Sequence, residues 1–203
     1  MSLPHFTARA AVGVASVVLA LCGTRVAVGT PGFPGAPHRW LERLVRRFPS
    51  DLQTGGRAAV GWVVFGAVAV AVTVLHFVGI QRELYTAIWW WDLLTHSLGG
   101  VGVAGLAYQT HRGRETVAAS VWWVVPSVFA IGSGFEVYEF LFKSFWHELT
   151  LRTYAVDTAV DLVVNTTGAT LVAAVVSVFV PTTDGEGSVD STERSESVDA
   201  RAE

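Results

Sequence analysis

The sequence predicts an all-α integral membrane protein, a bundle of about five transmembrane helices followed by a disordered acidic tail. Three observations support this fold class. Hydrophobic residues make up 51% of the 203 residues, and charged residues only 15%. Long apolar runs recur along the chain up to residue 181, without a linker between them. Residues 182–203 are instead rich in acids, serine and threonine, and such a composition cannot bury enough apolar surface to fold.

Five segments approach the roughly 20 apolar residues that a helix needs to cross a bilayer core of about 30 Å. The predicted spans are residues 8–28, 58–80, 87–108, 116–142 and 157–180, all within one bundle of residues 1–181. The first run, between Arg9 and Arg25, could instead be a cleaved signal peptide with Ala27-Val28-Gly29 as the cleavage site. Pro126 is expected to kink the fourth span.

Lysine and arginine in short loops predict the orientation, because cytoplasmic loops retain these residues. Arginines concentrate between the first and second spans and again after the third. We therefore expect a multi-pass protein of the cell membrane with its N-terminus outside and its C-terminus in the cytoplasm. The stretch 38–48 is expected to form a short amphipathic surface helix. Its lipid-facing residues would be Trp40, Leu41, Leu44, Val45 and Phe48.

Polar residues inside the last three spans are predicted to meet at the outer membrane face, because successive helices run in opposite directions. Residues of one helix three or four positions apart share a face. The candidate site residues are Asp92 and His96 in the third span, Glu136 and Glu139 in the fourth, and Asp157, Asp161 and Asn165 in the fifth. The required close helix approach would be allowed by Gly99, Gly100, Gly102, Gly105, Gly132 and Gly134.

A divalent metal ion is one way to compensate this group of acids, since uncompensated charges inside a bilayer are costly. Carboxylate, imidazole and amide oxygen ligands together suit Mg, Mn, Zn or Fe. The candidate metal ligands are Asp92, His96, Glu136, Glu139 and Asp161. Cys22 is the single cysteine, so a disulfide framework and a thiolate cluster are both excluded.

Simpler interpretations exist for each of these residues. Asp92 and Asp157 each begin a predicted helix, where a carboxylate can cap free backbone N–H groups. The other acids could hold helices together as structural polar groups. His76 fits a buried, hydrogen-bonded histidine, whereas His111 and His147 are expected to be solvated at the interface. Gly132-Ser133-Gly134 is similar to an intramembrane serine protease motif, but a partner histidine in a later helix is missing.

The motifs of the last three spans resemble those of VanZ-like and YjdF-type membrane proteins. The matching pieces are Trp91-Asp92 with His96, Phe135-Glu136-Val137-Tyr138-Glu139-Phe140, and the stretch from Tyr154 to Ala169. Glu139 stands where VanZ-like proteins usually have glutamine, which favours the YjdF-type side. The resemblance implies a membrane location and, for VanZ-like members, a link to the cell envelope.

These observations leave several functions open. The first hypothesis is a site near the outer leaflet that binds a divalent cation or a polar or lipid head group. As an enzyme, the protein would be a metal-assisted hydrolase or transferase acting on a lipid-linked substrate. The alternatives are a proton-coupled transporter and a non-catalytic membrane scaffold. Membrane lipid is the expected partner, a homo-oligomer is possible, and no sequence feature supports nucleic-acid binding.

Overall fold

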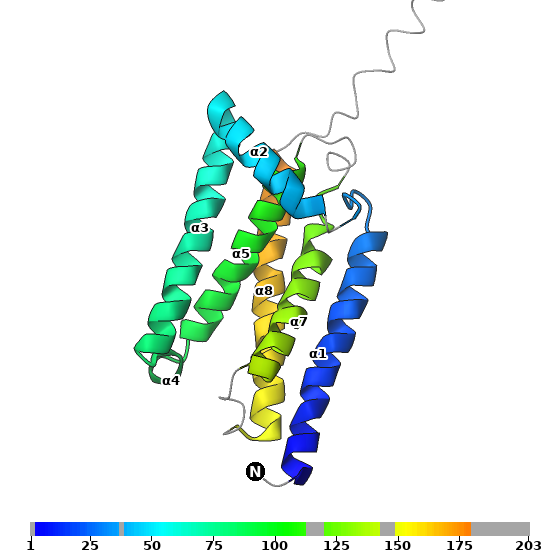
Figure 1. Ribbon diagram of the computed structural model, residues 1–203, viewed down its shortest axis with the longest axis vertical. Coiled ribbons are helices and arrows are strands. Elements are labelled where there is room, and N and C mark those ends of the chain that lie inside the picture. The colour runs from blue at the N-terminus through cyan, green and yellow to red at the C-terminus, as the bar shows by residue number, and fades with distance from the viewer. Residues whose placement is uncertain (1–2, 37–38, 113–119, 143–148, 180–203) are drawn as a thin grey trace, which may run out of the picture.

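The computed structural model describes residues 3–36, 39–112, 120–142 and 149–179, and these residues form helices and connecting turns without a β-strand (Figure 1). The predicted all-α bundle is therefore confirmed. The helices are α1 (Leu3–Gly29), α2 (Trp40–Thr54), α3 (Gly56–Gln81), α4 (Leu84–Ala87), α5 (Trp91–His111), α7 (Val124–Phe142) and α8 (Leu151–Phe179). Two predictions, the disorder of residues 182–203 and the solvent exposure of His147, concern residues outside the described ranges.

The long helices run alongside one another, and the short helices lie at the two ends of the bundle (Figure 1). Helix α8 packs against α5 and α7, while α3 packs on α5 and α1 packs on α7. Helix α2 crosses the end where α3 begins, and α4 lies at the opposite end. This order brings the start of α5, the end of α7 and the start of α8 to the same end of the bundle.

Four helices in the described part of the chain are long and apolar enough to cross a membrane. These spans are Ala10–Gly29, Gly56–Gln81, Val124–Phe142 and Leu151–Phe179. Helix α5, which covers the third predicted span, has 21 residues but is less apolar than these four spans. Several of its polar side chains are buried against neighbouring helices, among them Thr95, Gln109 and Thr110. Burial of these groups inside protein explains why α5 can lie among the spans without being as apolar as they are.

The observed helix bounds correct two predictions. Helix α7 begins at Val124, not near residue 116, so Pro126 lies in its first turn, where no helical hydrogen bond is lost and no kink is needed. Helix α8 begins at Leu151, six residues before the predicted start. The hydroxyl of Thr150 accepts a hydrogen bond from the backbone N–H of Thr153 (3.1 Å), as an N-cap does. Asp157 lies two turns further on, so the capping interpretation of Asp157 is wrong.

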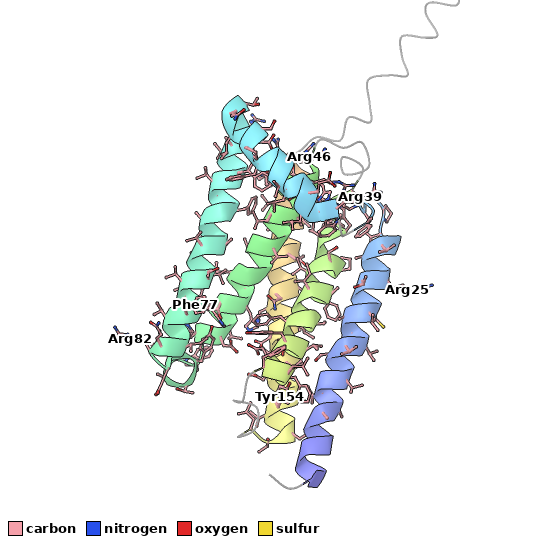
Figure 2. All side chains as sticks on the ribbon, in the orientation of Figure 1. Arg25, Arg39, Arg46, Phe77, Arg82 and Tyr154 are labelled. Atoms are coloured by element: carbon pink, nitrogen blue, oxygen red, sulfur yellow. The ribbon has the colours of Figure 1, made fainter. Side chains whose placement is uncertain are left out.

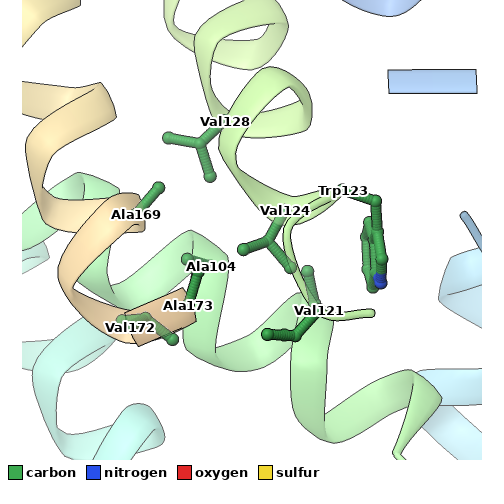
Figure 3. Close-up of a cluster of buried hydrophobic side chains, with 9 residues drawn as sticks. Ala104, Val121, Trp123, Val124, Val128, Ala169, Val172 and Ala173 are labelled. Carbon is green, nitrogen blue, oxygen red and sulfur yellow. The ribbon is translucent and has the colours of Figure 1, made fainter. Parts of the chain in front are cut away.

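The apolar core lies between α5, α7 and α8, towards the end of the bundle that α2 covers (Figure 3). Val124 and Val128 of α7 face the small side chains Ala169 and Ala173 of α8, and the ring of Trp123, just before α7, lies on the other side of Val124. Ala104 of α5 completes the contact. Large residues on one helix and alanines on its neighbours let the helices approach closely, so the core positions the polar half of the bundle.

Helix α2 covers the segment predicted to be amphipathic, and it leaves Leu41, Val45 and Phe48 exposed along one side. Trp40 differs from the prediction. Its ring lies against Trp123 and His111, with centroids 5.5 Å and 5.1 Å apart, so it faces the bundle and not the lipid. His111 is 0% exposed, which also corrects its predicted place in solvent. The preceding chain brings Phe33 beside Trp40, and this aromatic contact holds the start of α2 inward.

A polar contact fastens the other part of α2 to α3 and α5. The Asp51 carboxylate pairs with the Arg112 guanidinium at 2.9 Å and accepts a hydrogen bond from Trp62 Nε1 at 2.8 Å. Arg47 donates to the Arg112 carbonyl. Burial alone would raise the pKa of Asp51, but the hydrogen bonds from Arg112 and Trp62 and the charges of Arg112 and Arg47 outweigh it and lower this pKa below its ordinary value of 3.8.

Replacing Asp51 by asparagine is expected to lower the free energy of unfolding by about 1 kcal/mol at neutral pH. Because the pKa of Asp51 is depressed in the folded protein, its stabilisation is present above about pH 4 and is lost as the pH falls through the folded pKa. Thermal unfolding of both proteins in detergent, followed across this pH range, measures the difference. Glu42→Gln serves as the control, because the Glu42–Arg46 pair lies on the same helix but is exposed. An equal loss in both variants would contradict the role of Asp51.

Candidate polar site within the helix bundle

The candidate site forms where α5 and α8 cross almost backbone to backbone. A Cβ atom added to Gly100 would collide with the backbone carbonyl oxygen of Asn165. A Cβ on Gly168 would lie 2.5 Å from the Ser97 carbonyl oxygen. The predicted role of Gly100 in close approach is thus supported, whereas a Cβ on Gly134 would meet no atom within 4 Å among the described residues. Small residues at this crossing bring the polar faces of α5 and α8 together.

Asp92, His96 and Asp161 form the centre of the site. The Nε2 atom of His96 lies 3.4 Å from Oδ1 of Asp92, one helical turn away, and 3.7 Å from Oδ2 of Asp161 on α8. One ligand atom from each of the three residues lies within 4.8 Å of the other two. Both separations exceed the roughly 2.7–3.2 Å of an ordinary N–H···O hydrogen bond. The three groups therefore face one another across a small gap.

Asn165 holds the other side of the His96 ring. Its side-chain Nδ2 lies 3.1 Å from Nδ1 of His96. With the amide in this orientation Asn165 donates, so Nδ1 accepts and the ring proton of a neutral His96 resides on Nε2. Rotating the amide by half a turn would present Oδ1 instead, and the proton would then reside on Nδ1. Asn165 can thus support either tautomer of His96.

Glu136 on α7 faces the same interior. It is 2% exposed, and its Oε2 accepts a hydrogen bond of 3.0 Å from the hydroxyl of Thr158. Among the described residues, no hydrogen-bond partner lies within reach of Oε1. The charge of Glu136 interacts with those of Glu139, His96 and Asp157. A buried carboxylate with one unmatched oxygen is costly unless a proton or a cation compensates it.

The site lies deeper than the sequence predicted. Since α8 begins at Leu151, Asp161 is about 15 Å along that helix at 1.5 Å per residue, and Asn165 is at its midpoint. Asp161 is 3% exposed. Asp92 remains in the first turn of α5, but no side-chain hydrogen bond caps this helix, and the Asp92 carboxylate points to His96 instead. The capping interpretation therefore accounts for neither aspartate.

A cavity of about 260 Å³ lies beside His96 and Asn165. Its wall comes from α3, α5, α7 and α8, and its lining includes the polar side chains Thr73, His76 and Thr95. The Phe135 ring contacts both imidazoles, with ring centroids 6.4 Å from His76 and 6.1 Å from His96. The Nδ1 atom of His76 is hydrogen-bonded to the Tyr85 hydroxyl at 2.8 Å. A small polar group could therefore reach the His96 ring from this cavity.

Sequence reasoning missed Thr158, Tyr85 and Phe135 as parts of the site. Thr158 directly follows a candidate acid, but only the rotation of α8 shows that it reaches Glu136. Ser133, considered as a nucleophile, is 0% exposed and donates to the carbonyl of Phe129 at 2.9 Å. This bond occupies its hydroxyl proton within its own helix, so the geometry gives no support to a serine nucleophile.

Comparison with known proteins supports the membrane assignment. A family model described as a predicted membrane protein (DUF2238) matches residues 52–181, which include α3 to α8 and every candidate site residue. Searches of curated proteins and of solved structures found no match. Because the matched segment is more than half of the chain, the protein belongs to the DUF2238 family of predicted membrane proteins.

Proposed function

We propose that the protein binds a divalent cation between Asp92, His96 and Asp161, and that the cation holds a polar head group in the adjoining cavity. The observation that carries this proposal is the convergence of two carboxylates and one imidazole from two helices, with ligand atoms within 4.8 Å of one another. The three residues are held by the α5–α8 crossing, where glycine permits near contact of the two backbones. A site built on such a rigid crossing is favourable for binding an ion.

The distances between the donor atoms fit a metal ion after a small contraction. Oxygen and nitrogen ligands lie about 2.0–2.2 Å from Zn²⁺, so two ligands of one ion are at most roughly 4.4 Å apart. The observed upper limit of 4.8 Å needs movement of less than about 1 Å, within the reach of side-chain rotation. The mixed carboxylate and imidazole donors favour Zn²⁺, Mn²⁺ or Fe²⁺ over Ca²⁺. Glu136 and Glu139 lie outside this set of three.

Charge balance also supports a cation. Asp161 and Glu136 are both almost fully buried, and the charges of Asp92, Glu136 and Asp157 all act on Asp161. Mutual repulsion of buried carboxylates is costly, and His96 supplies at most one compensating positive charge. A divalent ion would reduce this repulsion directly. Asn165 fits the same purpose, because its amide oxygen could accept the Nδ1 proton of His96 and so turn the unprotonated Nε2 toward the ion.

The bound cation would act as a Lewis acid toward an oxygen atom of the head group. The chain's own residues would orient that group, because the side chains that line the cavity include His96, Asn165, His76 and Phe135. Phosphate oxygens are suitable, since hard anionic oxygens bind divalent ions. We also propose that the protein functions in the cell envelope, because its motifs resemble those of VanZ-like and YjdF-type proteins. The end of the bundle that carries α2, with Arg39 and Arg46, would face the cytoplasm (Figure 2).

A proton relay is the second candidate function. In the observed amide orientation, the proton on His96 Nε2 faces two carboxylates, as a relay requires. This alternative needs no metal ion.

The deciding experiment is elemental analysis of protein purified in mild detergent without chelator. A stoichiometric amount of Zn, Mn or Fe is expected in the parent and less than about a tenth of it in Asp161→Asn, because that change removes a ligand charge. Asp157→Asn is the matched control: it removes the same charge four residues away on α8, outside the group of three, and should retain the metal. If the parent holds no metal and binds none on dialysis against Zn²⁺ and Mn²⁺, cation binding is wrong and proton relay is favoured.

A further inference from the structure

We propose that a groove between α1 and α8 binds one phospholipid of the surrounding membrane through an acyl chain. The groove has a volume of about 800 Å³ and lies apart from the cavity beside His96. It is lined mainly by small and apolar side chains, among them Ala11, Ala15 and Leu19 of α1 and Ala155, Ala159 and Leu162 of α8. This inference does not depend on cation binding.

The hydroxyl groups in the groove do not make it a polar site. Ser16, Thr166, Thr167 and Thr170 each donate to the carbonyl four residues earlier in their own helix, at 2.6–3.1 Å. Thr158 donates to Glu136. The hydroxyl protons are thus all used, and the lining is otherwise apolar. A buried water needs about two to four polar partners, so the groove suits hydrocarbon better than water.

Packing of α1 explains why protein does not fill this space. Helix α1 contacts α7 far more extensively than α8. A Cβ on Gly13 would lie 2.7 Å from the ring of Phe140, and one on Gly23 would lie 2.8 Å from the ring of Phe129. These glycines let α1 press onto α7, which leaves its α8 side uncovered. Between helices that lie in hydrocarbon, such a space is filled by lipid because an empty one forfeits its dispersion contacts.

The length and the end of the groove favour a phospholipid. Along α8 the lining extends from Leu151 to Thr170, about 28 Å at 1.5 Å per residue. The acyl chains of one leaflet extend through about half of the roughly 30 Å bilayer core, so an acyl chain fits lengthwise within this groove. Arg152 is exposed beside Leu151, at the end of the groove. A guanidinium group at the membrane surface is suited to bind a lipid phosphate.

Lipid analysis of purified protein tests this proposal. After exhaustive washing in mild detergent, native mass spectrometry of the full chain should detect about one retained phospholipid per protein molecule. Ala159→Trp, which fills the groove, should reduce the retained lipid at least tenfold. The control is Val156→Trp, which adds the same ring at a position on α8 that is 54% exposed and outside the lining, and it should retain lipid like the parent.

Circular dichroism and gel filtration would establish that both variants are folded and monodisperse. Absence of retained lipid from the parent, or equal retention by the two tryptophan variants, would overturn the proposal. So would a dimer in which cross-links from α1 and α8 show that a second copy of the chain covers the groove.

Discussion

Replacing Gly100 by alanine is expected to destabilise the bundle by about 3 kcal/mol or more, the upper part of the range for overpacking. The added Cβ would overlap the backbone carbonyl oxygen of Asn165. Backbone atoms cannot rotate away as a side chain can, so α5 and α8 would have to separate along their crossing. That movement would also pull Asp92 and His96 away from Asp161. Thermal unfolding in detergent measures the loss, and metal content measures the damage to the site.

Gly134→Ala is the matched control for this prediction. Gly134 lies inside α7, and a Cβ there meets no described atom within 4 Å. Alanine favours helix by up to about 1 kcal/mol relative to glycine, so this variant should be as stable as the parent or more stable. If Gly100→Ala lowers the free energy of unfolding and Gly134→Ala does not, the α5–α8 contact, and not helix propensity, is what requires glycine at position 100. A stable Gly100→Ala protein would show that the crossing is looser than described.

Replacing Asn165 by alanine is expected to weaken binding of the divalent cation 10- to 100-fold, although Asn165 is not among the three ligand residues. Its amide contacts Nδ1 of His96 at 3.1 Å and so holds the ring in place, and its oxygen could accept the Nδ1 proton of a metal-bound His96. Without it, the imidazole can rotate and its Nδ1 loses a partner. Titration of metal-free protein with Zn²⁺, followed by calorimetry, gives the affinity.

Asn165→Asp distinguishes positioning from simple packing. A carboxylate at this position still accepts the Nδ1 proton of His96, so this variant should bind Zn²⁺ more tightly than Asn165→Ala does. Thr167→Ala, on the lipid-exposed side of the same helix, should bind like the parent. Equal affinities for Asn165→Ala and the parent would show that Asn165 does not position His96 for the cation.

The long helices of the bundle could be predicted from the sequence, because an apolar run of about 20 residues is typical of a transmembrane helix. The predicted start of α8 was wrong for a physical reason. Its first turn, with Arg152 and Thr153, is too polar to be recognised as a span, yet the Thr150 hydroxyl caps it. The prediction that Trp40 faces lipid is wrong for a related reason. The sequence pattern places Trp40 beside exposed apolar residues, and only the fold brings Trp123 and His111 against it.

The meeting of Asp92 and His96 with Asp161 could be predicted from antiparallel helices and spacing alone. Which partner each remaining polar residue of the site contacts could not be predicted in this way. Whether a carboxylate on α7 faces His96 or Thr158 depends on the rotation of that helix about its axis, which is set by contacts such as Gly132 of α7 against Asn165 of α8. The cavity beside Phe135 is formed by four helices, so no local pattern indicates it.

The pairing of α1 with α7 has a consequence for how the chain enters the membrane. Helix α1 is synthesised before the other described helices, but its main neighbour, α7, is one of the last of them to be made. It must therefore persist alone in lipid during most of translation. Helix α5 has a packing partner as soon as it is made. Helix α3, the long helix before it, packs along α5, so the two can insert together as a helical hairpin. Helix α7 carries Glu136 and Glu139 and has the lowest mean hydropathy of the four candidate spans. When α7 inserts, α1 is already in the membrane and can pack against it.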